Sequence, residues 1–427
     1  MKYLELNQFR CFDQIEIQFK KGINVLIGDN SNGKTSLLMA CKYALSTFFI
    51  GFSDLHTRLI SPTSVDFRIN INKDGIRMPL KPIVISFSAI HSNLEDKVYS
   101  VQKNSAKNSK LSIVGMKEFK SATKFLLDNL YNGESRRQIL PVFACFSTED
   151  IHSKRKINSK LFSNINPMAS FGYYECFEAK GFWDYWKKRM LILQEANIEE
   201  GELNIVKRAI LNVFEGIIDK LDIRVNAKEV LFYFCDGRII EAERLSDGYK
   251  RLMNIVIDIA FRSALLNREV LGDNAAEKSF GTVLIDEIDM HLHPSLQSSV
   301  LQRLKRAFSN IQFIVTTHLP MVMANLRSGA EDVIYKLAYN KISDKYTIEE
   351  VSAYGRDISS VVDVVLGISP RNKETDDKLK FLFDLIDQDN ISEAKSILSE
   401  LKEEYTDSLP EFIKAETMIN FLSDEED

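Results

Sequence analysis

Residues 28–35 are Gly-Asp-Asn-Ser-Asn-Gly-Lys-Thr, a complete G-x-x-x-x-G-K-T motif. The apolar run before it, residues 23–27, predicts a buried strand, and residues 36–40 predict a helix. In this setting the glycines allow backbone N–H groups to converge on a triphosphate, Lys34 neutralises the β and γ oxygens, and the Thr35 hydroxyl ligates magnesium. The alternative is a tight turn that matches by chance. We expect ATP and Mg²⁺ to bind here, the nucleotide through Gly28, Asn30, Asn32, Gly33, Lys34, Thr35 and Ser36.

A second apolar run, residues 282–285, ends in the two carboxylates of Asp286 and Glu287. At the carboxyl edge of a parallel sheet, Asp286 would lie beside phosphate-bound magnesium and Glu287 could polarise an attacking water. The alternative is a solvated acidic strand end, which is common in proteins without a phosphate loop. We therefore predict that Thr35 and Asp286 ligate the metal and that Glu287 is the catalytic base.

A third segment, residues 244–250, opens a long apolar helix with Leu245, Ser246 and Gly248. A hydroxyl and free backbone N–H groups at a helix N-terminus form a second cradle for phosphate. The alternative is an ordinary helix cap with a glycine turn. His318 follows the apolar run 313–317, from which an imidazole can touch a γ-phosphate, although a single histidine is more often structural.

The composition is that of a globular protein with two or three domains, or with one large domain that carries an insertion. The chain has 427 residues, of which 45% are hydrophobic and 27% charged, and no apolar run is long enough to span a bilayer. The start of the sequence lacks the layout of a signal peptide, so we expect a cytoplasmic protein without a membrane partner. Five scattered cysteines predict neither a disulfide framework nor a zinc ribbon.

Hydrophobic periodicity divides the chain into four expected regions. We expect a hairpin within residues 4–19, strands at 67–72 and 82–88, a helix over 206–221 that leads into two strands at 230–235 and 238–240, and a buried helix at 250–266. Strands at 282–285 and 311–315, separated by a helix that begins at Pro294, predict a parallel sheet. The tail predicts three helices near 375–387, 392–404 and 410–422. The regions are 1–44, an N-terminal lobe; 45–240, an inserted and helical region that completes this lobe; 241–340, a second lobe; and 341–427, an acidic helical tail.

The order of these motifs resembles that of the ABC-type, RecF-like ATPases over residues 1–340. Residues 286–294 and 315–320 are similar to the branch that includes the OLD-type nucleases and the PtuA ATPases of Septu antiphage systems, with retron-associated relatives. The resemblance implies an α/β P-loop NTPase fold of ABC/RecF-like type with an inserted subdomain and a helical C-terminal tail. It implies that Leu245, Ser246 and Gly248 act in trans across a homodimer or higher oligomer. It also implies Asp289 as the D-loop residue, His318 as the switch histidine and Arg10 as a nucleotide contact.

Two features depart from the pattern of that family. Asp247 stands where transporters have glycine, which places a negative charge near the partner's phosphates. The Q-loop glutamine, a magnesium contact in the family, has two candidates, Gln102 and Gln138.

The resemblance implies an antiphage ATPase that regulates a separate HNH-type nuclease. The 87 residues after Asn340 are too few for the TOPRIM nuclease of OLD-type relatives, so we expect no nuclease activity in this chain. From residue 371 onward there are 7 Lys and Arg against 17 Asp and Glu, a charge balance that favours a basic protein partner over DNA. The alternatives are a DNA-repair ATPase that clamps DNA as RecF does and a nucleotide-sensing scaffold with little turnover.

Three further groups of residues have ordinary alternatives. Asp289, His291 and His293 have side chains that ligate zinc, but the same residues occur in the family's D-loop. Two other segments, residues 154–156 and 183–189, combine basic residues, the second with two tryptophans, and are candidate DNA contacts. A solvated charged face is the alternative for both segments.

Overall fold

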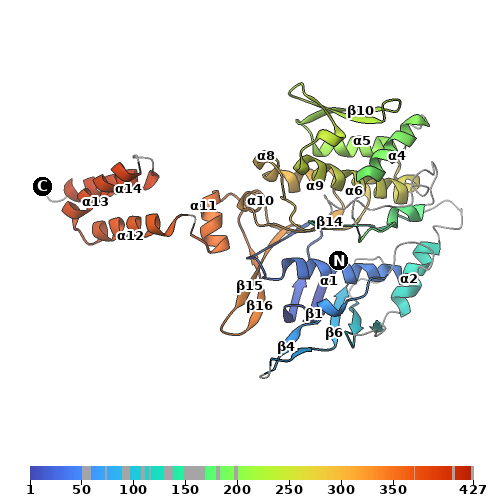
Figure 1. Ribbon diagram of the computed structural model, residues 1–427, viewed down its shortest axis with the longest axis horizontal. Helices are drawn as coiled ribbons and strands as arrows, with labels where there is room; N and C mark the ends of the chain where they lie inside the picture. Colours follow the sequence, from blue (N-terminus) through green and yellow to red (C-terminus); the bar gives the residue numbers. More distant parts are fainter. Residues whose placement is uncertain are drawn as a thin grey trace. The chain divides into compact units, whose positions relative to one another are not determined.

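A six-stranded sheet, in the order β16-β15-β3-β14-β13-β9, forms the centre of the larger unit of the computed structural model (Figure 1). The structure describes residues 1–50, 59–72, 75–88, 97–106, 111–114, 117–128, 138–148, 169–178, 183–196, 201–369, 371–405 and 409–424. The strands β9, β13, β14, β3 and β15 run parallel, and β16 pairs antiparallel with β15 at the edge. Their bounds are β3 Ile23–Ile27, β9 Val142–Phe146, β13 Gly281–Ile285, β14 Ile311–Thr316, β15 Val333–Asn340 and β16 Lys345–Val351.

The predicted parallel sheet is confirmed, and its register brings four strand ends together. Ile285 lies opposite both Phe146 and Val315, and Val315 lies opposite Val25 on β3. The carboxyl ends of β9, β13, β14 and β3 therefore meet at one edge, where ligands bind in open α/β sheets. The sequence reading missed β9.

A second sheet, in the order β2-β1-β6-β7-β8, is antiparallel. The predicted N-terminal hairpin is confirmed, with Leu4 opposite Ile17 and Leu6 opposite Ile15. The strands predicted at 67–72 and 82–88 correspond to β4 and β6, and β4 forms a separate hairpin with β5. The bounds are β1 Tyr3–Phe9, β2 Phe12–Gln18, β4 Ile69–Ile71, β5 Arg77–Pro79, β6 Ile83–Ser88, β7 Tyr99–Lys103 and β8 Ser112–Val114.

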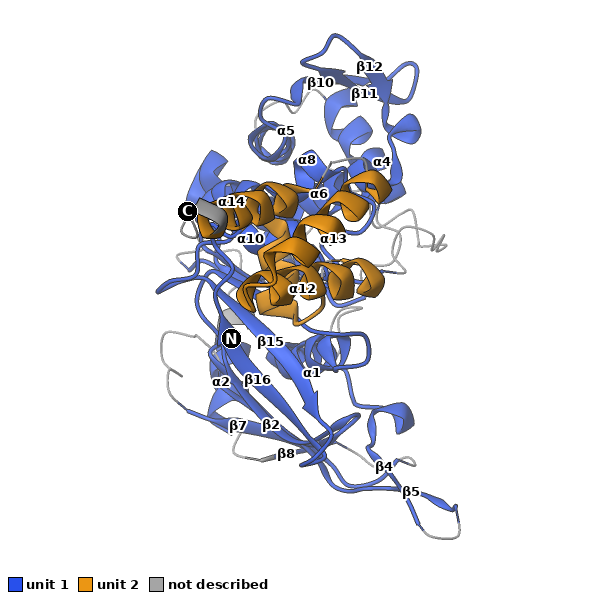
Figure 2. Cartoon of the chain, turned by 90° about the vertical axis from the view of Figure 1, so that its left-hand side faces the viewer, with its two compact units in different colours: residues 1–356 blue, residues 357–427 orange. Residues whose placement is uncertain are grey.

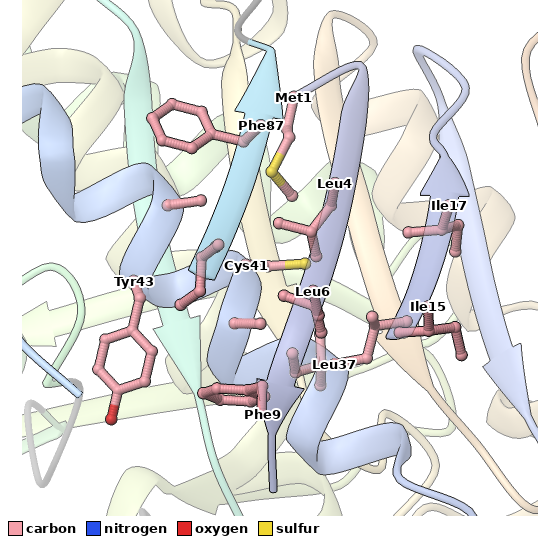
Figure 3. Close-up of a cluster of buried hydrophobic side chains, with 14 of the residues drawn as sticks. Met1, Leu4, Leu6, Phe9, Ile15, Ile17, Leu37, Cys41, Tyr43 and Phe87 are labelled. Atoms are coloured by element: carbon pink, nitrogen blue, oxygen red, sulfur yellow. The ribbon is translucent and has the colours of Figure 1, made fainter. Parts of the chain in front are cut away.

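Helix α1, Lys34–Ser46, packs against both of these sheets. Its residues contact β13 and β14 on one side and β6 on the other. Leu37, Cys41 and Tyr43 point toward Leu4, Leu6 and Phe9 of β1 in one buried cluster (Figure 3). This core fixes the helix that begins directly after the glycine-rich loop.

Helix α6, Asp247–Leu271, is buried along most of its length, as the apolar run 250–266 predicts. It packs on α5, Glu202–Val213 (Figure 1). It also packs on β9, the edge strand of the central sheet. The predicted helix over 206–221 is too long, because the chain turns after Val213 and Gly216 has a φ of 75°. The residues that follow form the strand β10, so the helix leads into three strands and not two: β10 Ile218–Arg224, β11 Glu229–Phe234 and β12 Ile239–Glu241.

The remaining helices of the larger unit are short or peripheral. The helix predicted to begin at Pro294 does begin there, but it ends after one turn and a second helix follows. The α-helices are α2 Lys117–Asp128, α4 Trp183–Glu195, α7 Ala275–Lys278, α8 Pro294–Gln297, α9 Val300–Ala307 and α10 Pro320–Ala324, and the 3-10 turns are η1 Thr47–Phe49, η2 Ser64–Asp66, η3 Ala169–Tyr173, η4 Ala242–Arg244 and η5 Gly272–Asn274.

The chain divides into two compact units, residues 1–356 and 357–427 (Figure 2). The second unit contains α11 Ile358–Ser360, the π-helix η6 Val361–Leu366, α12 Lys373–Asp387, α13 Ile391–Glu404 and α14 Pro410–Asp424. The three predicted tail helices are confirmed, and they share their own core of buried leucines, alanines, isoleucines and a phenylalanine. The boundary predicted at residue 341 differs from this division, because β16 pairs with β15 and extends the central sheet.

Candidate nucleotide site

The loop at residues 28–35 connects β3 to α1 at the carboxyl edge of the central sheet. Two of its positions require glycine. Gly28 has a φ of 139°, and a Cβ there would lie 2.3 Å from the Leu337 carbonyl oxygen. Gly33 has a φ of 89°, and its Cβ would lie 2.4 Å from the Phe12 ring. Asn32 donates from Nδ2 to the same Leu337 oxygen at 3.1 Å, which fixes the loop against β15.

Lys34 folds back under the loop that precedes it. Its Nζ donates to the Gly28 oxygen at 2.7 Å and to the Asp29 oxygen at 2.9 Å. Burial lowers the pKa of the Lys34 ammonium, and the nearby carboxylates of Asp286, Asp29 and Glu287 partly offset that effect. A cation held inside a ring of backbone groups is suited to bind the oxygens of a polyphosphate.

Thr35 and Asp286 meet where α1 faces the end of β13. The Thr35 hydroxyl donates to the Asp286 carboxylate at 3.0 Å, and Thr316 at the end of β14 donates to the same carboxylate at 2.6 Å. Hydroxyl and carboxylate oxygens are the ligands that Mg²⁺ prefers beside phosphate, so the pair fits this ion. The two motifs, 251 residues apart in sequence, are therefore adjacent in the fold.

Glu287 follows Asp286 in a left-handed backbone conformation, with a φ of 50°. Its backbone N–H donates to the Thr316 hydroxyl at 2.7 Å, and its side chain is partly exposed. Left-handed φ is uncommon for a residue other than glycine and costs free energy that its surroundings must supply. Asp286 and Glu287 directly follow β13, so both lie at the carboxyl end of this strand. The left-handed turn at Glu287 then directs the chain away from the strand.

Ser246 is the N-terminal cap of α6 and is exposed, whereas Leu245 before it is buried. Gly248, in the first turn, packs closely against the backbone of the segment after β13. A Cβ at this glycine would lie 2.1 Å from the His291 oxygen. The helix N-terminus that bears the predicted signature residues thus lies against the predicted D-loop of the same chain.

Asp289 and His318 lie near the same strand ends. Asp289 is 9% exposed, and its Oδ1 has no hydrogen-bond partner among the described residues. His318 lies two residues beyond the end of β14 and is partly exposed. The preceding Thr317 is buried and donates its backbone N–H to the Leu26 oxygen at 3.3 Å. These contacts place His318 at the edge where the glycine-rich loop begins.

Arg10 is bound to a carboxylate of its own chain. Its Nε donates to Asp66 Oδ1 at 2.8 Å, and Asp66 is buried and also accepts from the Tyr43 hydroxyl at 2.7 Å. Burial raises the pKa of the Asp66 carboxyl, but the hydrogen bonds from the Thr63 backbone, Tyr43 and Arg10 outweigh it and lower that pKa. A nucleotide contact by Arg10 remains a prediction from the resemblance.

A small cavity of about 80 Å³ adjoins the Thr35–Asp286 pair, and the sequence did not indicate it. It is lined in part by Ser147, directly after β9, and by Glu178. Neither predicted Q-loop candidate lines it: Gln102 lies on β7 and donates to Asn104 at 2.7 Å, and Gln138 is exposed before β9 begins. The apolar run 142–146 was the sequence signal that could have indicated this cavity. A buried parallel strand next to β13 ends beside Asp286, so the residues that follow it line the same edge of the sheet.

The metal and DNA alternatives find little support in the described part of the chain. No group of three or more His, Cys, Asp or Glu could hold a metal ion there, and His293 instead caps α8 through Ser295. Within 183–189, Trp186 and Arg189 are buried: Trp186 donates to Asp258 at 2.8 Å, and Arg189 pairs with Glu202. Both side chains therefore stabilise the packing of α4, and a DNA contact by the rest of this segment stays a candidate. Residues 154–156 lie outside the described residues.

The chain is a P-loop protein of the ABC/RecF-like type. This class is defined by the order of the strands, the glycine-rich loop and the acidic end of β13 taken together. A family model described as "AAA domain, putative AbiEii toxin, Type IV TA system" matches residues 23–324, and the chain belongs to this family. None of the described helices is long and apolar enough to cross a membrane.

Among curated proteins, the chain is similar to a retron protein named as a probable ATPase and to a Septu protein. It is 35% identical over 152 residues to the "Retron Vc95 probable ATPase" of Vibrio cholerae, which covers 36% of this chain and 27% of that protein. It is 40% identical over 140 residues to the Septu protein PtuA of Bacillus mycoides, covering 32% of this chain and 18% of that protein. These matches confirm the resemblance to Septu and retron ATPases, and the chain spans 27% of the first relative and 18% of the second.

Among solved structures, the chain is similar to an Smc head bound to the C-winged helix domain of ScpA. The TM-score is 0.47 at 16% identity, and the match covers 82% of this chain and 97% of that one.

Proposed function

We propose that this chain is the ATP-binding and ATP-hydrolysing subunit of a cytoplasmic antiphage defence system, and that it regulates a separate HNH-type nuclease. One observation carries the ATPase proposal. The Thr35 hydroxyl lies 3.0 Å from the Asp286 carboxylate, so the loop that would hold the phosphates meets the strand end that bears both acidic residues. A phosphate-binding loop without hydrolysis would not need the second carboxylate, Glu287.

Each residue of the site has a distinct task in this proposal. Lys34 leaves the carbonyl oxygens of Gly28 and Asp29 to bind the β and γ phosphates, while loop N–H groups bind the remaining oxygens. Thr35 and Asp286 would hold Mg²⁺, which neutralises charge that develops on the phosphate oxygens. Glu287 accepts a proton from the attacking water, and His318 contacts the γ phosphate.

The second phosphate cradle, at Ser246, completes the site of another copy. Ser246 is exposed at the N-terminus of a 25-residue helix, a position that attracts anions. The resemblance to ABC-type ATPases supports a head-to-head homodimer in which Leu245, Ser246 and Gly248 of one copy contact ATP on the other.

The role in defence rests on the similarity to the Septu protein PtuA and the retron Vc95 ATPase. The residues from 371 onward carry 17 acidic against 7 basic side chains, which favours a basic protein as partner and disfavours DNA on this unit.

Hydrolysis is tested by steady-state phosphate release from the purified chain and from Glu287→Gln. We expect the variant to keep ATP binding and to lose about 10²–10⁴-fold in turnover, because the general base is removed. Turnover that survives the substitution would show that Glu287 is not the base. Absence of turnover in the wild-type chain would favour a nucleotide-sensing scaffold.

The nuclease partner is tested by co-expression of the chain with its adjacent genes, followed by mass measurement of the intact complex. An HNH protein in the complex is expected. Strong ATP-stimulated binding of duplex DNA by the isolated chain, with a steep salt dependence, would favour a DNA-repair role instead.

A further inference from the structure

The peptide group that joins Asp286 to Glu287 is held at both of its polar ends. Its carbonyl oxygen, on Asp286, accepts a hydrogen bond from Nη2 of Arg251 on α6. Its N–H, on Glu287, donates to the Thr316 hydroxyl at 2.7 Å. Two residues from different elements thus fix the orientation of one peptide plane.

This peptide precedes the left-handed turn at Glu287, where φ is 50°. Such a conformation is strained in a residue other than glycine and persists only when the surroundings determine it. Rotation of the peptide plane would change the direction in which the Glu287 side chain leaves the backbone. The two hydrogen bonds oppose that rotation.

Arg251 is well placed to resist movement. It is 5% exposed, and its helix is buried on most sides. Three residues earlier on the same helix, Gly248 packs against the His291 backbone. The start of α6 therefore contacts the chain both before and after Glu287, at Asp286 and at His291.

We propose that Arg251 is a positioning residue for ATP hydrolysis: by binding the Asp286 carbonyl oxygen it fixes the backbone of Glu287 and so aims the base at the attacking water. The inference rests on the proposed ATPase function. Arg251 is assigned this role through the backbone, because its guanidinium donates to the carbonyl oxygen of Asp286.

The test compares Arg251→Met and Arg251→Lys with the wild-type chain. Methionine fills similar volume without a donor, and a misplaced base is expected to cost about 10–100-fold in kcat while Kd and KM for ATP stay within about twofold. Lysine retains a donor, so its kcat should lie between those of the other two proteins. Arg208→Met is the matched control, since Arg208 also donates to a backbone oxygen, that of Asp273, but lies on α5.

A double substitution separates positioning from structural damage. In the Glu287→Gln background the base is already absent, so adding Arg251→Met should change the residual turnover by less than about twofold. Losses that multiply in the double variant would overturn the proposal, as would an unchanged kcat in Arg251→Met or an equal loss of ATP binding. If Arg251→Met does not fold, Arg251→Gln is judged by the same criteria.

Failure of this inference is distinguishable from failure of the proposed function. If Glu287→Gln abolishes turnover and Arg251→Met does not reduce it, only the role of Arg251 is wrong. If the wild-type chain does not hydrolyse ATP, the proposed function itself fails.

Discussion

Lys34 is the side chain on which the proposed phosphate site depends most. It is 7% exposed, and its Nζ is held by two carbonyl oxygens that a phosphate would replace as partners. Its burial lowers its pKa, so an added anion is expected to stabilise the ammonium form.

We predict that Lys34→Ala abolishes ATP binding as measured by isothermal titration calorimetry. The variant loop keeps its backbone N–H groups but loses its only positively charged side chain, because residues 28–35 contain no other Lys or Arg. Hydrogen bonds to charged groups contribute about 1.5–3 kcal/mol each. Lys21→Ala, on an exposed lysine before β3, is the control and should bind normally. Unchanged binding by Lys34→Ala would mean that the loop does not hold phosphate.

At the residue scale, local motifs were predictable and long-range partners were not. Gly33, Lys34 and Thr35 follow from eight consecutive letters, and the acidic pair follows from an apolar run. Thr316 and Arg251 lie 30 and 35 residues from Asp286 in sequence and join the site only through the fold. No spacing rule in a single sequence indicates such contacts.

At the scale of elements, buried strands were predicted correctly from the sequence where a recognisable motif follows the strand directly. β3 and β13 were found because each ends in a recognisable site segment. β9, which is equally buried, precedes no motif and was missed. The predicted helix ran past the end of α5 because Ile217 and Leu221 continue its apolar spacing by chance, whereas the chain turns between Val213 and β10.

The three-helix tail has a core of its own, which gives a prediction at the same scale. Leu382 on α12 is fully buried among α13 and α14 residues, and Leu382→Ala is expected to destabilise this unit by about 2–5 kcal/mol. Hydrogen exchange measured by mass spectrometry should then accelerate in peptides from α12–α14 and stay unchanged in peptides from the central sheet.

Phe381→Ala is the matched control for that experiment. Phe381 precedes Leu382 on the same helix but is 49% exposed, so its truncation should leave exchange nearly unchanged. Equal acceleration in both variants would contradict the core assignment, and spread of the effect to β3 and β13 would contradict the division into two units.

At the scale of the whole molecule, the proposed function gives one chain two separate phosphate cradles. The first is the loop before α1, and the second is the exposed N-terminus of α6 at Ser246. A dimer related by a two-fold axis lets each cradle serve the partner's nucleotide, since residues of one surface then meet the complementary residues of the other. The order of the motifs predicted both cradles, but their use across two copies comes from the family resemblance.

The most direct measurement is the mass of Glu287→Gln in solution with ATP and Mg²⁺, by light scattering after size exclusion. With water attack blocked, the proposal predicts a species of at least twice 48.9 kDa that requires nucleotide, and its loss when Ser246→Arg is added to the same chain. A species that stays at 48.9 kDa while calorimetry shows ATP bound would contradict a site shared between two copies.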